Sequence, residues 1–255
     1  MTSGAVAVVV PTLGQRIDYL RESLSSIRNA GDAFVAIVAP ADFDASGLLA
    51  DGLADIKIDE TGRSLPEAIN QGMDALADEI EFVTWLGDDD LLRPGALGVA
   101  EKELRLRPRA SAVYGRCDYI DESGATVWRN SSGAWASPLL RVGPDLVPQP
   151  GSLIRRSAWR AVGGVRTDLG WAFDFDLFLK LSKVGSLRFV PVVLAAFRWH
   201  QGSLSVGQRR DSVREASQVR RDHLPRWVRP LSVLWEGPVR WATFRASALV
   251  EKGSR

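Results

Sequence analysis

Short apolar runs alternate with amphipathic segments through the first 106 residues, and this alternation restricts the possible folds more than any other feature. The runs are Val6–Val10, Phe34–Val38, a short stretch around Ile56 and Ile58, and Phe82–Leu86. An unbroken β-branched run predicts a strand that is covered on both faces. Strands that alternate with helices over short links form parallel sheets. We therefore expect an α/β fold with a Rossmann-like, mostly parallel sheet that helices cover on both faces.

The helices between these strands have signals of their own. Residues Ile17–Ile27 carry apolar side chains at helical spacing. Ser64 predicts the start of a helix that continues to Ala77, with Glu67 as its capping-box partner. Pro94–Leu106 predicts another helix, because proline is tolerated in a first turn.

The second half of the chain is less regular. Strands are expected at Ala112–Tyr119, at Ala125–Trp128 and at Val190–Trp199, where Pro191 interrupts the run. Trp171–Val184 predicts a helix. The stretch Asn130–Pro150 has no period, and a loop of this length is usually functional or mobile.

The composition excludes several classes of protein. Cys117 is the single cysteine, and with the two histidines it leaves neither a disulfide framework nor a structural zinc set. A net charge of +1 does not indicate nucleic-acid binding. No basic region precedes Val6–Val10, and Pro11 ends that run too early for a signal peptide. We expect a cytoplasmic protein without a nucleic-acid partner.

Three consecutive acids, Asp88–Asp90, follow the fourth apolar run. Ligands of parallel sheets bind beyond the carboxyl ends of the strands, where these acids and Pro11-Thr12 both fall. Adjacent carboxylates repel one another unless a cation lies among them, and Mg²⁺ and Mn²⁺ prefer oxygen ligands. The alternative is a solvated acidic turn; the position at the ligand edge favours a binding site.

Five segments in order resemble family 2 of the glycosyltransferases with the GT-A fold, over roughly residues 5 to 206. They are Val8–Thr12, Gly62–Gly72, Trp85–Leu97, Gln149–Leu181 (in its parts 149–156, 163–164 and 172–181) and Phe197–Ser205. This resemblance implies a metal-dependent, inverting transfer of a sugar from a nucleotide-diphosphate donor of the UDP, dTDP or GDP type. The acceptor is expected to be a hydroxyl of a glycan or a lipid-linked molecule, in cell-envelope or polysaccharide biosynthesis.

The resemblance also implies roles for individual residues. Asp174 takes the place of the catalytic base, and a divalent cation, Mn²⁺ or Mg²⁺, is expected on Asp89, Asp90 and His200. Gly87 stands where the family often has an acid, so the choice of ligands within the acidic triplet is open.

Donor and acceptor contacts are less sharply defined. The acid that the family carries after its second strand is missing, and Asp42 or Asp59 is expected to replace it. The expected nucleotide-sugar contacts are Pro11, Thr12, Arg16, Asp42, Asp59, Arg63, Asn70, Asp88 and Asp90. Gln149 and Asp176 are expected on the acceptor side.

The last 47 residues differ from the rest, so we divide the chain into a catalytic domain, 1–208, and a basic extension, 209–255. The extension holds eleven Lys or Arg and five Asp or Glu residues, with Trp227, Trp235 and Trp241 among them. Basic segments with tryptophan are typical of contact with an anionic membrane surface, here the inner face of the cell membrane. The alternative is that the extension packs on the catalytic domain.

Two other functions fit parts of the pattern. A non-catalytic module that binds a sugar nucleotide or a glycan would explain the missing acid, but it needs no base such as Asp174. A nucleotidyltransferase shares the sheet and the metal acids, but it needs a glycine-rich triphosphate loop, of which Pro11–Arg16 is a poor version.

Overall fold

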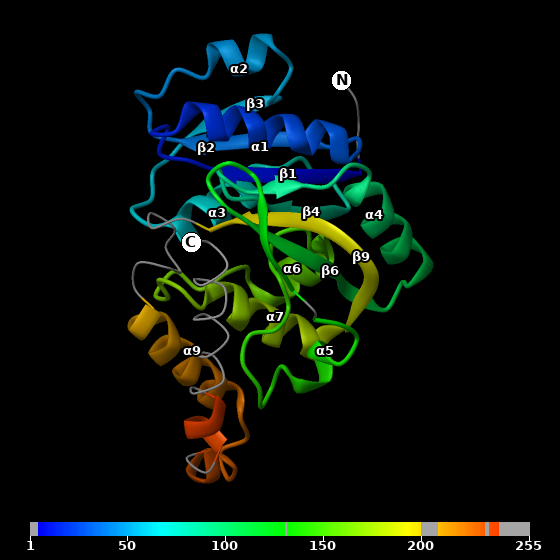
Figure 1. The fold of residues 1–255 in the computed structure, drawn as a ribbon, viewed down its shortest axis with the longest axis vertical. Helices are drawn as coiled ribbons and strands as arrows, with labels where there is room; N and C mark the ends of the chain where they lie inside the picture. The colour runs from blue at the N-terminus through cyan, green and yellow to red at the C-terminus, as the bar shows by residue number, and fades with distance from the viewer. Residues whose placement is uncertain (1–4, 131, 200–208, 233–234, 240–255) are drawn as a thin grey trace.

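The computed structural model describes residues 5–130, 132–199, 209–232 and 235–239, with the side chains of 209 and 210 excepted. Its strands form one nine-stranded sheet in the order β3-β2-β1-β4-β8-β6-β9-β5, with β7 paired to β6 (Figure 1). The strands are β1 (Val6–Pro11), β2 (Phe34–Ala39), β3 (Ile56–Asp59), β4 (Phe82–Trp85), β5 (Leu91–Leu92), β6 (Ala110–Ile120), β7 (Thr126–Arg129), β8 (Leu153–Arg155) and β9 (Ser186–Arg198). The helices are α1 (Ile17–Ala30), α2 (Ser46–Ala50), α3 (Leu65–Asp74), α4 (Ala96–Leu106), α5 (Ala136–Leu139), α6 (Arg156–Val162), α7 (Phe173–Val184) and α9 (Arg209–His223), with a 3₁₀ turn at Arg229–Ser232.

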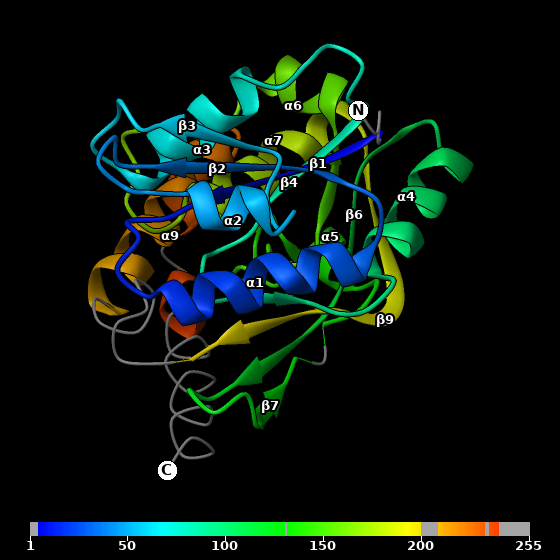
Figure 2. The same ribbon diagram turned by 90° about the horizontal axis from the view of Figure 1, so that it is seen from above.

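Strands β1 to β4 form the parallel block that the sequence predicts. Successive residues of β1 enter different cores: Val8 packs with α1 and α4, and Val9 packs with α3, α6 and α7. Figure 2 shows the strands between these two helical layers. Since both faces are buried, the strand has no polar position, which is why its sequence is an unbroken apolar run.

Helix α3 lies unusually close to this sheet. Ser64 caps it by accepting a hydrogen bond from the Glu67 backbone N–H, as the capping box predicts. A Cβ atom on Gly72 would lie 2.4 Å from Cγ1 of Val9. Glycine at this position therefore permits the close approach of helix and strand.

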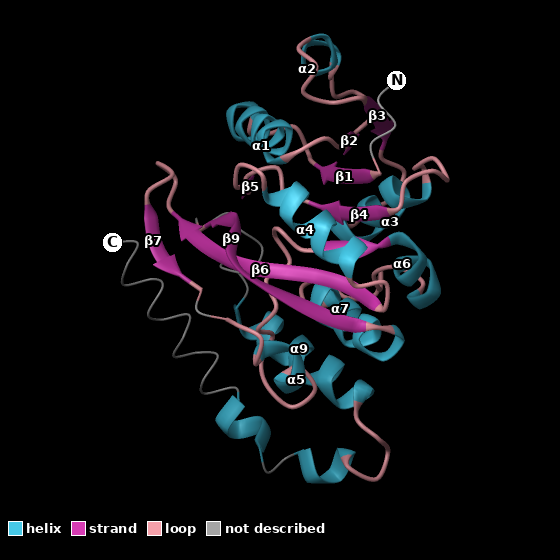
Figure 3. Cartoon of the chain, turned by 90° about the vertical axis from the view of Figure 1, so that its right-hand side faces the viewer, coloured by secondary structure: helices cyan, strands magenta, loops and turns pink. Residues whose placement is uncertain are grey.

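The second half of the sheet is mixed. Strand β8 is antiparallel to both β4 and β6, whereas the long strands β6 and β9 run parallel to each other (Figure 3). The pairing of β6 with β9 shifts between Phe189 and Val193, so Pro191 falls in an irregular stretch rather than ending the strand. The end of β9 pairs with β5, the two-residue strand that directly follows the acidic triplet.

Helix α9, the first part of the basic extension, lies beside α7 (Figure 1). Val213 and Val219 on α9 are buried. Up to His223 the extension therefore packs on the body that carries α7. Within the described ranges, no helix combines the length and the apolar content needed to cross a membrane.

Candidate active site

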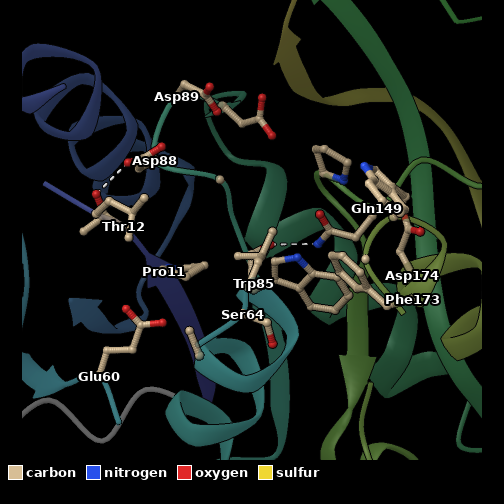
Figure 4. A pocket seen from close by; sticks show the side chains of 18 of the residues that line it. Pro11, Thr12, Glu60, Ser64, Trp85, Asp88, Asp89, Gln149, Phe173 and Asp174 are labelled. Carbon is tan, nitrogen blue, oxygen red and sulfur yellow. Dashed lines mark hydrogen bonds between the residues drawn. The ribbon is translucent and has the colours of Figure 1, made fainter. Parts of the chain in front are cut away.

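A cavity of about 540 Å³ opens at the carboxyl edge of the parallel strands (Figure 4). One side comes from the ends of β1, β3 and β4, and the other from the segments before β8 and at the start of α7. Its lining includes the predicted residues Pro11, Thr12, Arg16, Arg63, Asp88, Asp89, Asp90, Gln149 and Asp174. The topology thus brings together residues that lie up to 163 positions apart.

The acidic triplet forms the turn between β4 and β5, and its carboxylates have different surroundings. The Thr12 hydroxyl donates to Oδ2 of Asp88 at 2.5 Å. Arg16 Nη1 lies 3.3 Å from Oδ2 of Asp89. The backbone N–H of Arg198 donates to Oδ1 of Asp90 at 2.9 Å. Burial raises the pKa of Asp88, and burial together with the charge of Asp89 raises the pKa of Asp90 well above its usual range.

Gly87 gives the triplet its shape. A Cβ atom at this position would lie 3.0 Å from Oδ2 of Asp90 and 3.1 Å from Oδ1 of Asp89. These two carboxylate oxygens therefore lie close to the space that a side chain at position 87 would fill. An acid at this position would crowd them, which gives a physical reason for the departure from the family pattern.

The carboxylates suit a divalent cation that is shared with a substrate. In the part of the chain that the structure describes, no three His, Cys, Asp or Glu side chains form a metal-binding group. Mg²⁺ commonly takes one or two carboxylates and completes its shell with water and substrate phosphates. The converging oxygens of Asp89 and Asp90 fit such a site, and the raised pKa values indicate negative charge that a cation would stabilise. His200, the third predicted ligand, lies outside the described residues.

Arg198 holds the acidic turn in place. Its side chain is 1% exposed, and its Nε donates to the backbone oxygen of Asp89 at 2.9 Å. The same guanidinium donates to the backbone oxygens of Asp121 and Glu122 and to Oε2 of Glu22. One buried side chain therefore joins the acidic turn to α1 and to the β6–β7 turn.

Asp174 lies across the cavity from the acids, in the first turn of α7 (Figure 4). Its Oδ1 accepts a hydrogen bond from the Phe175 backbone N–H at 2.8 Å. Burial raises its pKa from 3.8 to about 6, although this hydrogen bond opposes the shift. A carboxylate with a pKa near the working pH is suited to accept a proton.

Aromatic side chains form the wall beside Asp174. The rings of Trp85 and Phe173 lie 6.3 Å apart between centroids, and both line the cavity. Gln149 is buried, and its Nε2 donates to the backbone oxygen of Trp85 at 2.8 Å. This hydrogen bond holds Gln149, the predicted acceptor-side residue, against the end of β4 in the cavity wall.

At the end of the cavity formed by β3, where Asp42 or Asp59 is predicted, the acid that lines the cavity is Glu60. Asp59 points to solvent and pairs with Lys57 at 2.6 Å, and Asp42 is exposed in the turn after β2. Because strand residues alternate between faces, the residue after Asp59 points the opposite way. Burial raises the pKa of Glu60. Alternation along β3 was the signal that could have identified Glu60 from the sequence.

Two further predicted contacts lie away from the cavity. Nδ2 of Asn70 donates to the backbone oxygen of Val165 at 2.8 Å, and Oδ1 of Asn70 accepts from the Val165 backbone N–H at 3.1 Å, so this side chain connects α3 to the turn after α6. Asp176 is 1% exposed and bonds Lys180 at 2.9 Å and His223 at 2.7 Å. A separation of two residues along a helix turns Asp176 away from Asp174. Their positions indicate structural roles.

Comparisons with known proteins agree on the fold. No protein-family model and no curated protein matches the chain. Residues 1–349 of S. aureus TarS match with a TM-score of 0.65 and 13% identity, over 94% of this chain and 72% of that one. In a longer TarS structure, the match covers 42% of the TarS chain. A mannosyltransferase from Pyrobaculum calidifontis, in complex with GDP-Man and Mn²⁺, matches with a TM-score of 0.64 and 19% identity, over 96% and 75% of the two chains.

A third similar structure is glucosyl-3-phosphoglycerate synthase from Mycobacterium tuberculosis, in complex with Mn²⁺, UDP and glucosyl-3-phosphoglycerate. It matches with a TM-score of 0.55 and 16% identity, over 83% of this chain and 79% of that one. At such identities the likeness establishes the fold. The chain has the GT-A fold, as the sequence predicts.

Proposed function

We propose that this GT-A chain is an inverting, family 2 type glycosyltransferase that uses a nucleotide-diphosphate sugar and a divalent cation. One observation carries the proposal: a single cavity holds the acidic triplet on one side and Asp174, with its raised pKa, on the other. Inverting transfer requires this separation, because the acceptor attacks from the face opposite the leaving group. The similar structures that contain Mn²⁺ with UDP or GDP-Man support the donor class.

In the proposed reaction, Asp174 takes the proton from the attacking hydroxyl. Gln149 and the aromatic wall orient the acceptor and exclude water from the reacting carbon. Asp89 and Asp90 would hold the cation, which supplies charge neutralisation for the departing diphosphate. Arg16 and Arg63, which also line the cavity, provide positive charge near the same leaving group.

For the nucleotide, we propose that Glu60 replaces the acid that the family carries after its second strand. Its side chain lies at the end of β3 and lines the cavity with Ser64 and Leu65. A carboxylate accepts hydrogen bonds from ring N–H and ribose hydroxyl groups, which UDP, dTDP and GDP all offer in different arrangements. The first measurement should therefore determine which of the three nucleotides the protein binds.

We further propose a glycan or lipid-linked acceptor and contact with an anionic membrane surface through the extension. Trp227 is 78% exposed and Leu231 is 50% exposed, and Arg226 and Arg229 lie beside them in sequence. Exposed aromatic and basic residues together favour an interfacial position. Binding to vesicles with and without anionic lipid, compared between the wild type and Trp227→Ala, tests this part.

The central experiment measures release of the free nucleotide diphosphate from UDP, dTDP and GDP sugars, with Mn²⁺, with Mg²⁺ and with EDTA. We expect turnover with one nucleotide class, loss of turnover in EDTA, and a decrease of at least about a hundredfold for Asp174→Asn. Asp51→Asn, at an exposed acid that pairs with Arg21, is the control. Proton NMR of the product gives its anomeric configuration, and retention would contradict the assigned role of Asp174.

The alternatives give different results. A binding module would bind a nucleotide without turning it over. A nucleotidyltransferase would release pyrophosphate from a nucleoside triphosphate. Equal activity of wild type, Asp89→Asn and Asp174→Asn would refute the proposed function.

A further inference from the structure

The backbone that leads into helix α7, which carries Asp174, is held by another part of the chain. The residue before the helix is Ala172, whose side chain has no acceptor. Instead, the carboxylate of Glu215 on α9 accepts three backbone hydrogen bonds. The donors are the N–H groups of Gly170, Trp171 and Ala172, at 2.9, 2.7 and 2.6 Å. Hydrogen bonds to an ionised acceptor are about twice as strong as neutral ones, and a negative charge is favourable at a helix N-terminus.

Two of these three residues belong to the wall of the candidate active site. Gly170 and Trp171 line the cavity, and Asp174 follows two residues after the last bonded amide. A shift of this backbone would move both the aromatic wall and the carboxylate. Glu215 therefore acts on the site without lining the cavity itself.

Other contacts hold α9 in the position that these three hydrogen bonds require. Nε2 of His223 lies 2.7 Å from Oδ1 of the buried Asp176, and Nδ1 of His223 lies 2.9 Å from Nζ of Lys183. Asp222 pairs with Arg166 at 3.5 Å. The C-terminal end of α9 is thus attached to the body of the protein, and Glu215 lies between these attachments and the start of the helix.

We propose that Glu215 is a positioning residue for Asp174: through the backbone of residues 170–172 it sets the start of α7, so that the C-terminal extension is part of the catalytic machinery. This inference rests on the proposed function, because it takes Asp174 as the base. A carboxylate that binds three consecutive amides defines their orientation more narrowly than a single contact would.

A purely structural role and a positioning role differ in their effect on the base. The charged and titratable groups that act on Asp174 are Glu215 from α9, Asp145 from the loop before β8 and the Tyr119 phenol of β6. The negative charge of Glu215 contributes to the raised pKa of Asp174. Glu215→Gln removes this charge and keeps the side-chain shape. The pKa of Asp174 should then fall, and the acidic limb of the kcat profile should move to lower pH.

The test compares Glu215→Gln, Glu215→Ala and Glu215→Asp with wild type, and uses Asp211→Asn, an exposed acid on the same helix, as the control. The donor is the nucleotide sugar that wild type turns over fastest in the panel above. We expect kcat to fall about tenfold to a hundredfold in Glu215→Ala, as for a misplaced catalytic group. In the same variant, the dissociation constant for the nucleotide diphosphate with Mn²⁺ should stay within about twofold of the wild-type value. A misplaced base lowers the rate of the chemical step and leaves ground-state binding of the donor unchanged. Glu215→Asp should recover part of the rate.

Hydrogen exchange makes the test independent of turnover. In wild type the amides of residues 170–172 should exchange slowly, and in Glu215→Ala they should exchange at least about tenfold faster, as expected for opened hydrogen bonds. Carbon NMR titration of Asp174 in wild type and Glu215→Gln gives its pKa directly. Unchanged exchange, an unchanged pKa of Asp174, or a kcat within twofold of wild type in Glu215→Ala would each overturn the proposal. Absence of turnover in wild type would instead refute the proposed function, while exchange and titration would still decide whether Glu215 sets this backbone.

Discussion

Replacing Asp174 by Asn should stabilise the protein at neutral pH while it removes the proposed base. The pKa of the Asp174 carboxyl, which is partly buried in the cavity wall, is raised from 3.8 to about 6, mainly by desolvation. Above pH 6 the folded protein therefore holds a carboxylate that water would solvate better. Asn has the same shape, carries no charge, and can still accept the Phe175 backbone hydrogen bond.

The size of the effect follows from the shift in pKa. One pKa unit corresponds to 1.36 kcal/mol, so a shift from 3.8 to about 6 destabilises wild type by up to about 3 kcal/mol at pH 8. The folded state binds the proton more tightly than the unfolded state, so this cost is absent below pH 3.8 and grows as the pH rises toward 6. At pH 4.5 the same relation leaves about 1 kcal/mol.

Urea denaturation of wild type and Asp174→Asn at pH 8 and pH 4.5 measures this difference. We expect Asp174→Asn to have the larger free energy of unfolding at pH 8. The difference from wild type should be smaller by about 2 kcal/mol at pH 4.5. The control is Asp51→Asn, which changes an exposed acid and should show no such trend. A gap that is equal at both pH values, or a less stable Asp174→Asn at pH 8, would refute the account of a destabilising buried base.

Other contacts give further predictions. Arg198→Lys should lower the free energy of unfolding by about 2 to 4 kcal/mol, because a buried ammonium cannot make all the hydrogen bonds that the guanidinium gives to the backbone oxygens of Asp121 and Glu122; a urea-denaturation loss under 1 kcal/mol would contradict this. Gly72→Ala should cost about 1 to 3 kcal/mol by overpacking against Val9, seen as a lower Tm, whereas an unchanged Tm would mean that α3 can move away. Gly87→Asp should weaken Mn²⁺ binding in the presence of the nucleotide about tenfold by crowding the triplet, and stronger binding by electron paramagnetic resonance would show that the added acid is a ligand. Glu60→Gln should raise the Kd for the nucleotide diphosphate about tenfold in calorimetry, the value for one lost charged hydrogen bond, and an unchanged Kd would remove Glu60 from the nucleotide site.

The parallel block could be predicted because its sequence leaves few alternatives. A strand buried on both faces must be apolar throughout, and Val6–Val10 satisfies this requirement. The capping box at Ser64 is a local interaction, so it is visible in the sequence. Clustering of the acids with Thr12 followed from the same topology, because parallel strands end at a common edge.

Features that depend on distant contacts could not be predicted. Nothing near Asn70 in sequence indicates that its amide binds Val165, which lies 95 residues away. The short strand β5 exists because β9 supplies its partner, and two residues alone have no strand signal. Glu215 is an ordinary surface acid in the sequence, and only the packing of α9 reveals what it binds.

The attachment of Arg198 to the acidic turn has a consequence for synthesis on the ribosome. Strands β1 to β4 are complete once residue 85 has emerged, and these local elements can pair early. The acidic turn then waits for more than one hundred further residues, because β9 and the Arg198 guanidinium close it from the far end of the fold. At about 5 to 20 residues per second, this wait lasts on the order of 5 to 20 seconds. During that interval the carboxylate of Asp90 and the backbone of Asp89 lack the Arg198 hydrogen bonds that hold them in the folded protein. The nascent chain should therefore acquire its affinity for nucleotide and Mn²⁺ only as its last strand joins the sheet.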